Sequence, residues 1–191
     1  MIEGPIQQPA LRTRRLILRA PESRDAAPMQ TLAADRRVAE MTLNIPHPYP
    51  DGAAEAWLQQ RWQGLHDGTA ATFALAVPEE NAADPVAADT FIGAVGLAIN
   101  ARHSRAEIGY WVGVPYWNRG YVTEACVAVI EWAFQSLKLV RIEARHYPAN
   151  AASGRVMQKL GMQFEGVQRS YTQRDGIFRD SVIYALINSD R

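Results

Sequence analysis

The stretch EIGYWVGVPYWNRGYVTEA, residues 107–125, decides the fold. We expect its first six residues to form a strand that ends near Val112. Apolar residues then recur at helical spacing from Cys126 to Leu137, which predicts an amphipathic helix that begins near Tyr121. A helix start carries unpaired backbone N–H groups and the positive end of the helix dipole. This unit of strand, turn and helix can therefore bind phosphate oxygens.

Side chains in the turn favour the same use. Gly120 lets the backbone approach a ligand closely, and Arg119 can add a charge-assisted contact. Thr123 can cap the helix or bond an oxygen, while Glu124 suits the positive helix end. A glycine turn that merely starts a helix would explain these residues equally well. The turn therefore needs support from the rest of the chain.

Hydrophobic periodicity extends the pattern in both directions. Three prolines exclude regular structure from residues 44–51, and residues 78–89 are expected to form an exposed loop. We predict one α+β domain over residues 1–191, with a core of about residues 10–188 and a mixed sheet. Strands are predicted at residues 14–19, 72–77, 90–99, 107–112, 140–147, 162–172 and 177–186. One or two helices are predicted over residues 22–41, and single helices at residues 53–66, 121–137 and 151–160.

Composition excludes several classes of protein. Lysine plus arginine and aspartate plus glutamate each number 20, so the basic excess of a nucleic-acid-binding protein is missing. No apolar run could span a bilayer, and residues 1–9 lack the core of a signal peptide. The one cysteine, Cys126, is expected to be a core thiol, and the histidines lack metal-ligand spacing. We expect a cytoplasmic protein that binds no nucleic acid, membrane or metal.

Four segments resemble the GNAT superfamily of acyl-CoA-dependent N-acyltransferases, and most of all its RimJ/RimL-type branch. Residues 116–125, YWNRGYVTEA, resemble the pyrophosphate loop Y-W-G-R-G-Y-A-T-E-A and depart from it at Asn118 and Val122. Residues 13–19, TRRLILR, resemble the first strand T-x-R-L-x-L-R. Residues 45–50, IPHPYP, resemble the acceptor-side loop I-P-x-P-Y, and residues 150–162 resemble N-x-x-S-x-R-V-x-x-K-x-G-F/M. The likeness covers nearly the whole chain.

The resemblance implies a three-layer αβα sandwich whose mixed, mostly antiparallel sheet is splayed where acetyl-CoA binds. In the family, the matching asparagine and serine approach the pantetheine arm and the sulfur. Asn150 and Ser153 also fit a simpler role at a helix start. The amide of Val112 is the candidate for polarising the thioester carbonyl. The residues implied to contact the cofactor are Trp111, Val112, Trp117, Asn118, Arg119, Gly120, Tyr121, Val122, Thr123, Asn150 and Ser153.

Amide formation also needs a neutral amine, and Glu107 is the candidate general base. Strand alternation places Glu107 on one face with Gly109 and Trp111. A surface carboxylate paired with a neighbouring arginine is the alternative interpretation. Ser153 is a second catalytic candidate. For protonation of the thiolate, the sequence does not choose between Tyr171 and Tyr184. The acceptor is expected to contact Pro48, Tyr49 and His146. For His146, a structural role is the commoner case among histidines.

The predicted function is N-acetyl transfer from acetyl-CoA to a primary amine, by direct attack in a ternary complex. The amine is a protein N-terminus or a small molecule. A non-catalytic acyl-CoA-binding regulatory module is the alternative. Another kind of phosphate-binding enzyme is disfavoured because the P-loop lysine is missing. A monomer or homodimer is expected.

Overall fold

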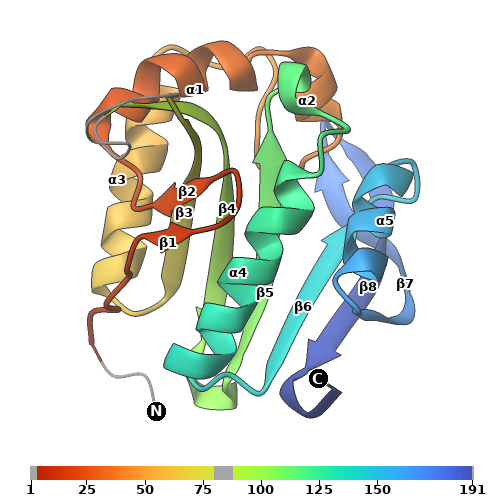
Figure 1. Ribbon diagram of the computed structural model, residues 1–191. Helices are drawn as coiled ribbons and strands as arrows, with labels where there is room; N and C mark the ends of the chain where they lie inside the picture. Colours follow the sequence, from red (N-terminus) through yellow and green to blue (C-terminus); the bar gives the residue numbers. More distant parts are fainter. Residues whose placement is uncertain (1–3, 80–87, 191) are drawn as a thin grey trace.

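One mixed sheet organises the molecule (Figure 1). The computed structural model describes residues 4–79 and 88–190, so most of the loop predicted over residues 78–89 lies outside the described residues. The predicted order of elements is confirmed, with one additional short strand at the start. The strands are β1 (Leu11–Arg12), β2 (Ile17–Arg19), β3 (Ala70–Pro78), β4 (Asp89–Asn100), β5 (Arg105–Val112), β6 (Arg141–His146), β7 (Gln163–Arg174) and β8 (Ile177–Ile187). The helices are α1 (Ala26–Ala33), α2 (Arg36–Glu40), α3 (Ala53–His66), α4 (Tyr121–Ser136) and α5 (Ala151–Lys159).

Helices cover both faces of the sheet, which confirms the αβα sandwich. On one face, Met29 of α1 and Leu58 of α3 pack against Ala74 and Phe91. On the other face, α4 and α5 lie over the sheet, in front of it in Figure 1. The strand order β1-β2-β3-β4-β5-β6-β8-β7 contains one parallel pair, β5 with β6. All other neighbouring strands are antiparallel.

The larger core lies beneath α4. Phe73 of β3 meets Trp132 of α4 edge-on, with ring centroids 5.2 Å apart. Cys126 is completely buried in the same cluster, and this burial raises the pKa of its thiol. A buried, protonated thiol is a poor nucleophile. The prediction of a core thiol is therefore confirmed.

The parallel pair is short, and this positions the site. β5 and β6 pair only from Arg105 with Arg141 to Glu107 with Glu143. β5 continues to Val112 and β6 to His146 without further pairing, and Figure 1 shows the two strands diverging. The predicted splay is therefore present, and it begins immediately after Glu107.

One of two N-terminal predictions needs correction. The strand expected over residues 14–19 is confined to Ile17–Arg19, because the chain turns back to pair with β1. The one or two helices expected over residues 22–41 are two, because the Asp35 carboxylate caps a new helix by accepting from Arg37 N at 2.9 Å. No helix within the described part of the chain is long and apolar enough to cross a membrane.

Candidate active site

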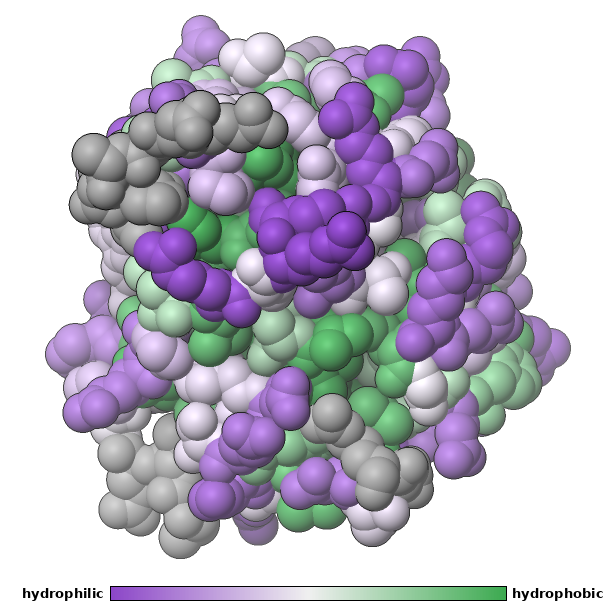
Figure 2. Space-filling view, in the orientation of Figure 1, coloured by the Kyte–Doolittle hydropathy of each residue, from purple (hydrophilic) through white to green (hydrophobic). Residues whose placement is uncertain are grey.

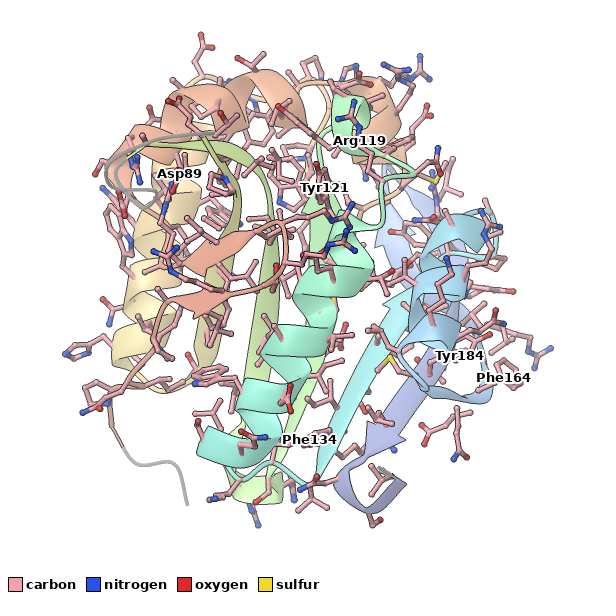
Figure 3. All side chains as sticks on the ribbon, in the orientation of Figure 1. Asp89, Arg119, Tyr121, Phe134, Phe164 and Tyr184 are labelled. Atoms are coloured by element: carbon pink, nitrogen blue, oxygen red, sulfur yellow. The ribbon has the colours of Figure 1, made fainter. Side chains whose placement is uncertain are left out.

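The turn before α4 presents open backbone donors. Asn118 and Gly120 have φ of 59° and 78°, a region that glycine adopts freely and asparagine tolerates. Gly120 is the N-cap of α4, and no side chain caps that helix start. The N–H groups of the first turn, beginning at Tyr121, are therefore available to an anion. Figure 3 shows Arg119 on the turn next to Tyr121.

The end of β5 leaves further backbone groups open. Gly113 donates to the carbonyl of Ile92 on β4 at 2.9 Å, and alternate residues of an antiparallel ladder bond to the same neighbour. Trp111 therefore bonds toward β4, whereas Val112 directs its backbone toward the edge from which β6 has parted. The Val112 carbonyl accepts from Trp117 Nε1 at 2.8 Å. The geometry favours the Val112 amide beside a thioester, whereas the Trp111 backbone is directed toward β4.

Asn150 and Ser153 lie at the start of α5, across the splay from β5. The Asn150 side chain caps α5 by accepting from Ser153 N at 3.1 Å, and its Nδ2 donates to the carbonyl of Met41 at 3.2 Å. The Ser153 hydroxyl lies 3.0 Å from the hydroxyl of Tyr110. Burial raises the pKa of Tyr110, so this phenol is neutral at pH 7. The helix-start role is therefore real for Asn150, while Ser153 directs its hydroxyl toward β5.

The opposite face of β5 carries Glu107, Gly109 and Trp111, as alternation predicted, and is called the Glu107 face below. Glu107 Oε2 accepts from Arg145 Nε at 3.0 Å, which is the ion pair of the alternative interpretation. The Glu107 side chain is still 44% exposed, and its Oε1 has no partner among the described residues. A Cβ atom added to Gly109 would meet no atom within 4 Å. Open space therefore lies between the carboxylate and the Trp111 ring.

Arg145 is held in place on every side. Its Nη1 donates to Gln168 at 2.7 Å, its Nη2 lies 3.1 Å from Glu143, and its guanidinium lies 4.9 Å from the centre of the Tyr171 ring. These contacts fix the position of Arg145, which in turn fixes one oxygen of Glu107. The carboxylate is thus positioned by a network from β6 and β7.

Two segments border this face. Tyr49 packs with Trp111 and Trp57 against the core of α1 and α3, and burial raises its pKa. Pro48 beside it is exposed. Arg174, at the end of β7, donates to the carbonyls of Ala39, Thr42 and Ile45, the last at 2.8 Å. The loop over residues 44–51, which was expected on the acceptor side, is therefore joined to the β7–β8 hairpin.

The comparisons with known proteins identify this arrangement. The model of the acetyltransferase (GNAT) domain family matches residues 15–163. The chain belongs to the GNAT acetyltransferase family. It is 32% identical over 182 residues to an uncharacterized N-acetyltransferase, p20, of Bacillus licheniformis, covering 94% of this chain and 97% of that protein. It is 30% identical to the ribosomal protein uS5-alanine N-acetyltransferase of Escherichia coli, covering 94% and 91%.

Solved structures share the fold. Mycobacterium smegmatis RimJ, in complex with CoA-disulfide, superimposes with a TM-score of 0.78 at 22% identity, covering 92% of this chain and 83% of that one. A GNAT-family acetyltransferase from Bacillus anthracis gives a TM-score of 0.79 at 24% identity, covering 94% and 99%. The chain is therefore an acetyltransferase of the RimJ/RimL-like kind, with acetyl-CoA as its acetyl donor and an amine as its acceptor.

The two departures from the loop motif fit this acetyltransferase. Asn118 occupies a left-handed position that suits the glycine of the motif and that asparagine also tolerates. Val122 packs its side chain against the core beneath α4. Neither side chain removes a backbone donor from the turn, and Thr123 follows Val122 in the first turn of α4.

His146 is placed differently from Glu107. Its Nδ1 donates to the Tyr147 carbonyl at 2.8 Å, and its buried Nε2 has no partner among the described residues. Along β6 it alternates with Arg145 and lies on the α5 face, against Gly154. The geometry favours the structural interpretation of His146 over contact with the acceptor. Of the two tyrosines considered for the thiolate, Tyr184 lies beside His146, with ring centroids 5.9 Å apart.

Sequence reasoning missed Tyr110 and Arg15. Tyr110 belongs to the strand that decided the fold, but its partner Ser153 is 43 positions away in the sequence. Arg15 lies in the β1–β2 turn, and its contacts are with residues more than 100 positions away. No periodicity could have brought those positions together.

Proposed function

We propose that this acetyltransferase acetylates the α-amino group of a polypeptide, by direct attack on acetyl-CoA in a ternary complex. The Escherichia coli relative is named for acetylating an alanine of ribosomal protein uS5, which supports a polypeptide acceptor. A small primary amine is the second candidate. A polyamine would need several free carboxylates, and Glu143 of the neighbouring strand is already bound by Arg105, Arg141 and Arg145.

One observation carries the proposal. β5 presents a half-exposed carboxylate beside open space on the Glu107 face, while its edge beyond Glu107 is free of β6. Donor and acceptor can therefore approach the same strand from two sides and meet at its open edge. Holding two reactants together in this way supplies much of the rate acceleration without a covalent enzyme intermediate.

Each group then has a role. A peptide amino terminus has a pKa of ~8 and must lose a proton to attack. Glu107 Oε1 accepts this proton directly or through one water molecule, while Arg145 holds the other oxygen. The N–H of Val112 donates to the thioester oxygen as negative charge develops there. The Ser153 hydroxyl donates to the departing sulfur. The turn over Arg119, Gly120 and Tyr121 binds the diphosphate.

The test is a panel of acceptors with acetyl-CoA. We expect thiol release with a peptide that begins with alanine, and mass spectrometry should place the acetyl group on its α-nitrogen. The same peptide with a blocked amino terminus and one lysine should be inert. Glu107→Gln should reduce kcat by about 100-fold, whereas Glu165→Gln, which removes an exposed carboxylate paired with Arg141, should not.

Two results would overturn the proposal. Turnover of small amines alone would reject a polypeptide acceptor. Tight CoA binding without thiol release from any amine would favour a regulatory module. We further propose that the enzyme works in the cytoplasm as a monomer or homodimer and needs no nucleic acid. Sedimentation of the active protein would measure its oligomeric state.

A further inference from the structure

Arg15 connects the β1–β2 turn to the turn over residues 119–121, called the diphosphate turn because it is proposed to bind the diphosphate. Its Nη1 donates to the carbonyl of Arg119 at 2.8 Å, and its Nε donates to Glu124 Oε2 at 2.7 Å. Nη2 lies 2.7 Å from the same oxygen. The guanidinium also lies 4.7 Å from the centre of the Tyr121 ring. A side chain from the start of the sequence thus contacts three residues of the turn and first helical positions of α4.

The Glu124 carboxylate completes this connection. Its Oε1 accepts from Thr13 Oγ1 at 2.6 Å and from the backbone N–H of Arg15 at 2.8 Å. Burial raises the pKa of Glu124, but the hydrogen bonds from Thr13 and Arg15 and the charge of Arg15 outweigh this effect and lower the pKa overall. The carboxylate is therefore ionised at neutral pH and holds Arg15 against α4.

Arg15 keeps hydrogen-bonding capacity beyond these contacts. A guanidinium has five N–H groups, and the contacts to Arg119 and Glu124 use three of them. The side chain is 41% exposed. Its Nη2 is also the described atom nearest to where a Cβ on Gly120 would lie, at 3.5 Å. Figure 2 shows hydrophilic residues gathered over this turn beside the start of α4.

We propose that Arg15 is a donor-binding residue. It holds the diphosphate turn in its binding shape through the Arg119 carbonyl, and its two remaining N–H groups bind the diphosphate of acetyl-CoA. The backbone amides at the start of α4 carry no net charge. Arg15 therefore supplies a full positive charge to balance the negative charge of the diphosphate. Arg119 lies in the turn itself, and its side chain is exposed.

A purely structural role is the alternative, because the same ion pair fastens β1 and β2 to α4. The two roles differ in what they change. Fastening alone affects the stability of the ligand-free protein, whereas donor binding affects the affinity for CoA and the KM for acetyl-CoA. Arg14 is the matched control, since it is the exposed neighbour with the same charge.

The experiment measures CoA binding by calorimetry to the full chain and to Arg15→Gln, Arg15→Lys and Arg14→Gln, with the melting temperature of each ligand-free protein. We expect Arg15→Gln to weaken CoA binding by about ten- to a hundredfold, because it removes charge-assisted hydrogen bonds. Arg15→Lys should keep part of the affinity, and Arg14→Gln should bind within about twofold of wild type. With a working acceptor, the KM for acetyl-CoA should rise while kcat at saturation stays within about twofold.

Unchanged CoA affinity in Arg15→Gln would overturn the proposal and leave fastening as the only role. An equal loss in Arg14→Gln would also overturn it, because general surface charge would then explain the effect. If Arg15→Gln does not fold, Arg15→Lys decides alone, since wild-type affinity there would reject the need for the guanidinium. CoA binding needs no acceptor, so these outcomes are independent of the proposed acetylation of polypeptides.

Discussion

The hydroxyl of Tyr110 on β5 lies 3.0 Å from the hydroxyl of Ser153 on α5, so a hydrogen bond crosses the space into which β5 and β6 diverge. The phenol also lies 3.3 Å from the Ser153 carbonyl oxygen. One partly buried side chain therefore sets the position of the hydroxyl expected beside the sulfur. Because burial disfavours the phenolate, Tyr110 acts as a neutral donor or acceptor and not as a base.

Replacing Tyr110 by phenylalanine tests this relationship. Tyr110→Phe removes the hydroxyl but keeps the ring, so Ser153 loses its partner. We expect kcat to fall by about tenfold, the equivalent of one net hydrogen bond, with little change in the KM for acetyl-CoA. Thiol release at saturating acceptor measures the effect. The double variant with Ser153→Ala should be no slower than Ser153→Ala alone, and a further additive loss would contradict the coupling.

The open space at Gly109 makes a second prediction. A Cβ there meets nothing within 4 Å, so Gly109→Ala should fold normally and Gly109→Val should project into the space beside Glu107. We expect Gly109→Val to raise the KM for the acceptor by at least about tenfold, because its side chain occupies the place of the amine substituent. CoA affinity and melting temperature should stay near wild type. A rise in the KM for acetyl-CoA instead would place the acceptor elsewhere.

Gly154 gives a contrasting case on the other face. A Cβ at this position would lie 2.9 Å from His146 Nε2 and 3.1 Å from its Cε1, and the ring is held by its bond to the Tyr147 carbonyl. Gly154→Ala should therefore destabilise the protein by about 1–3 kcal/mol through overpacking, despite the better helix propensity of alanine. Urea unfolding measures the change. The double variant His146→Ala with Gly154→Ala should recover part of the loss, and no recovery would show that the strain lies elsewhere.

The sequence was sufficient where the signal is local. The periodicity from Cys126 to Leu137 fixed α4, and alternation along β5 placed Glu107, Gly109 and Trp111 on one face. Asn118 matched a glycine position because both residues tolerate a left-handed backbone. Such features depend on a few neighbouring residues, so they can be recognised without knowing the fold.

The remaining features depend on contacts between distant residues. β1 has two residues, too few for a periodic signal, and exists only because β2 pairs with it. Tyr110 and Ser153 are 43 positions apart, and Arg15 and Glu124 are 109 apart. Each residue alone is typical of a core or a surface. Only the parting of β5 from β6 and the packing of α4 give these pairs a place in the site.

Glu124 allows a prediction about pH. Its pKa is lowered in the folded protein, so its contribution to stability is complete above the usual value of 4.5 and is lost as the pH falls through the lower folded value. Glu124→Gln removes this titration but leaves the other carboxylates unchanged. The difference in unfolding free energy between wild type and Glu124→Gln, measured in urea, should therefore be larger at pH 6.5 than at pH 3.5. The difference in CoA affinity between wild type and Glu124→Gln should also be larger at pH 6.5 than at pH 3.5, because a protonated Glu124 releases Arg15 from the turn. A stability difference that does not change with pH would show that the ion pair of Arg15 and Glu124 contributes nothing to holding α4 against the β1–β2 turn.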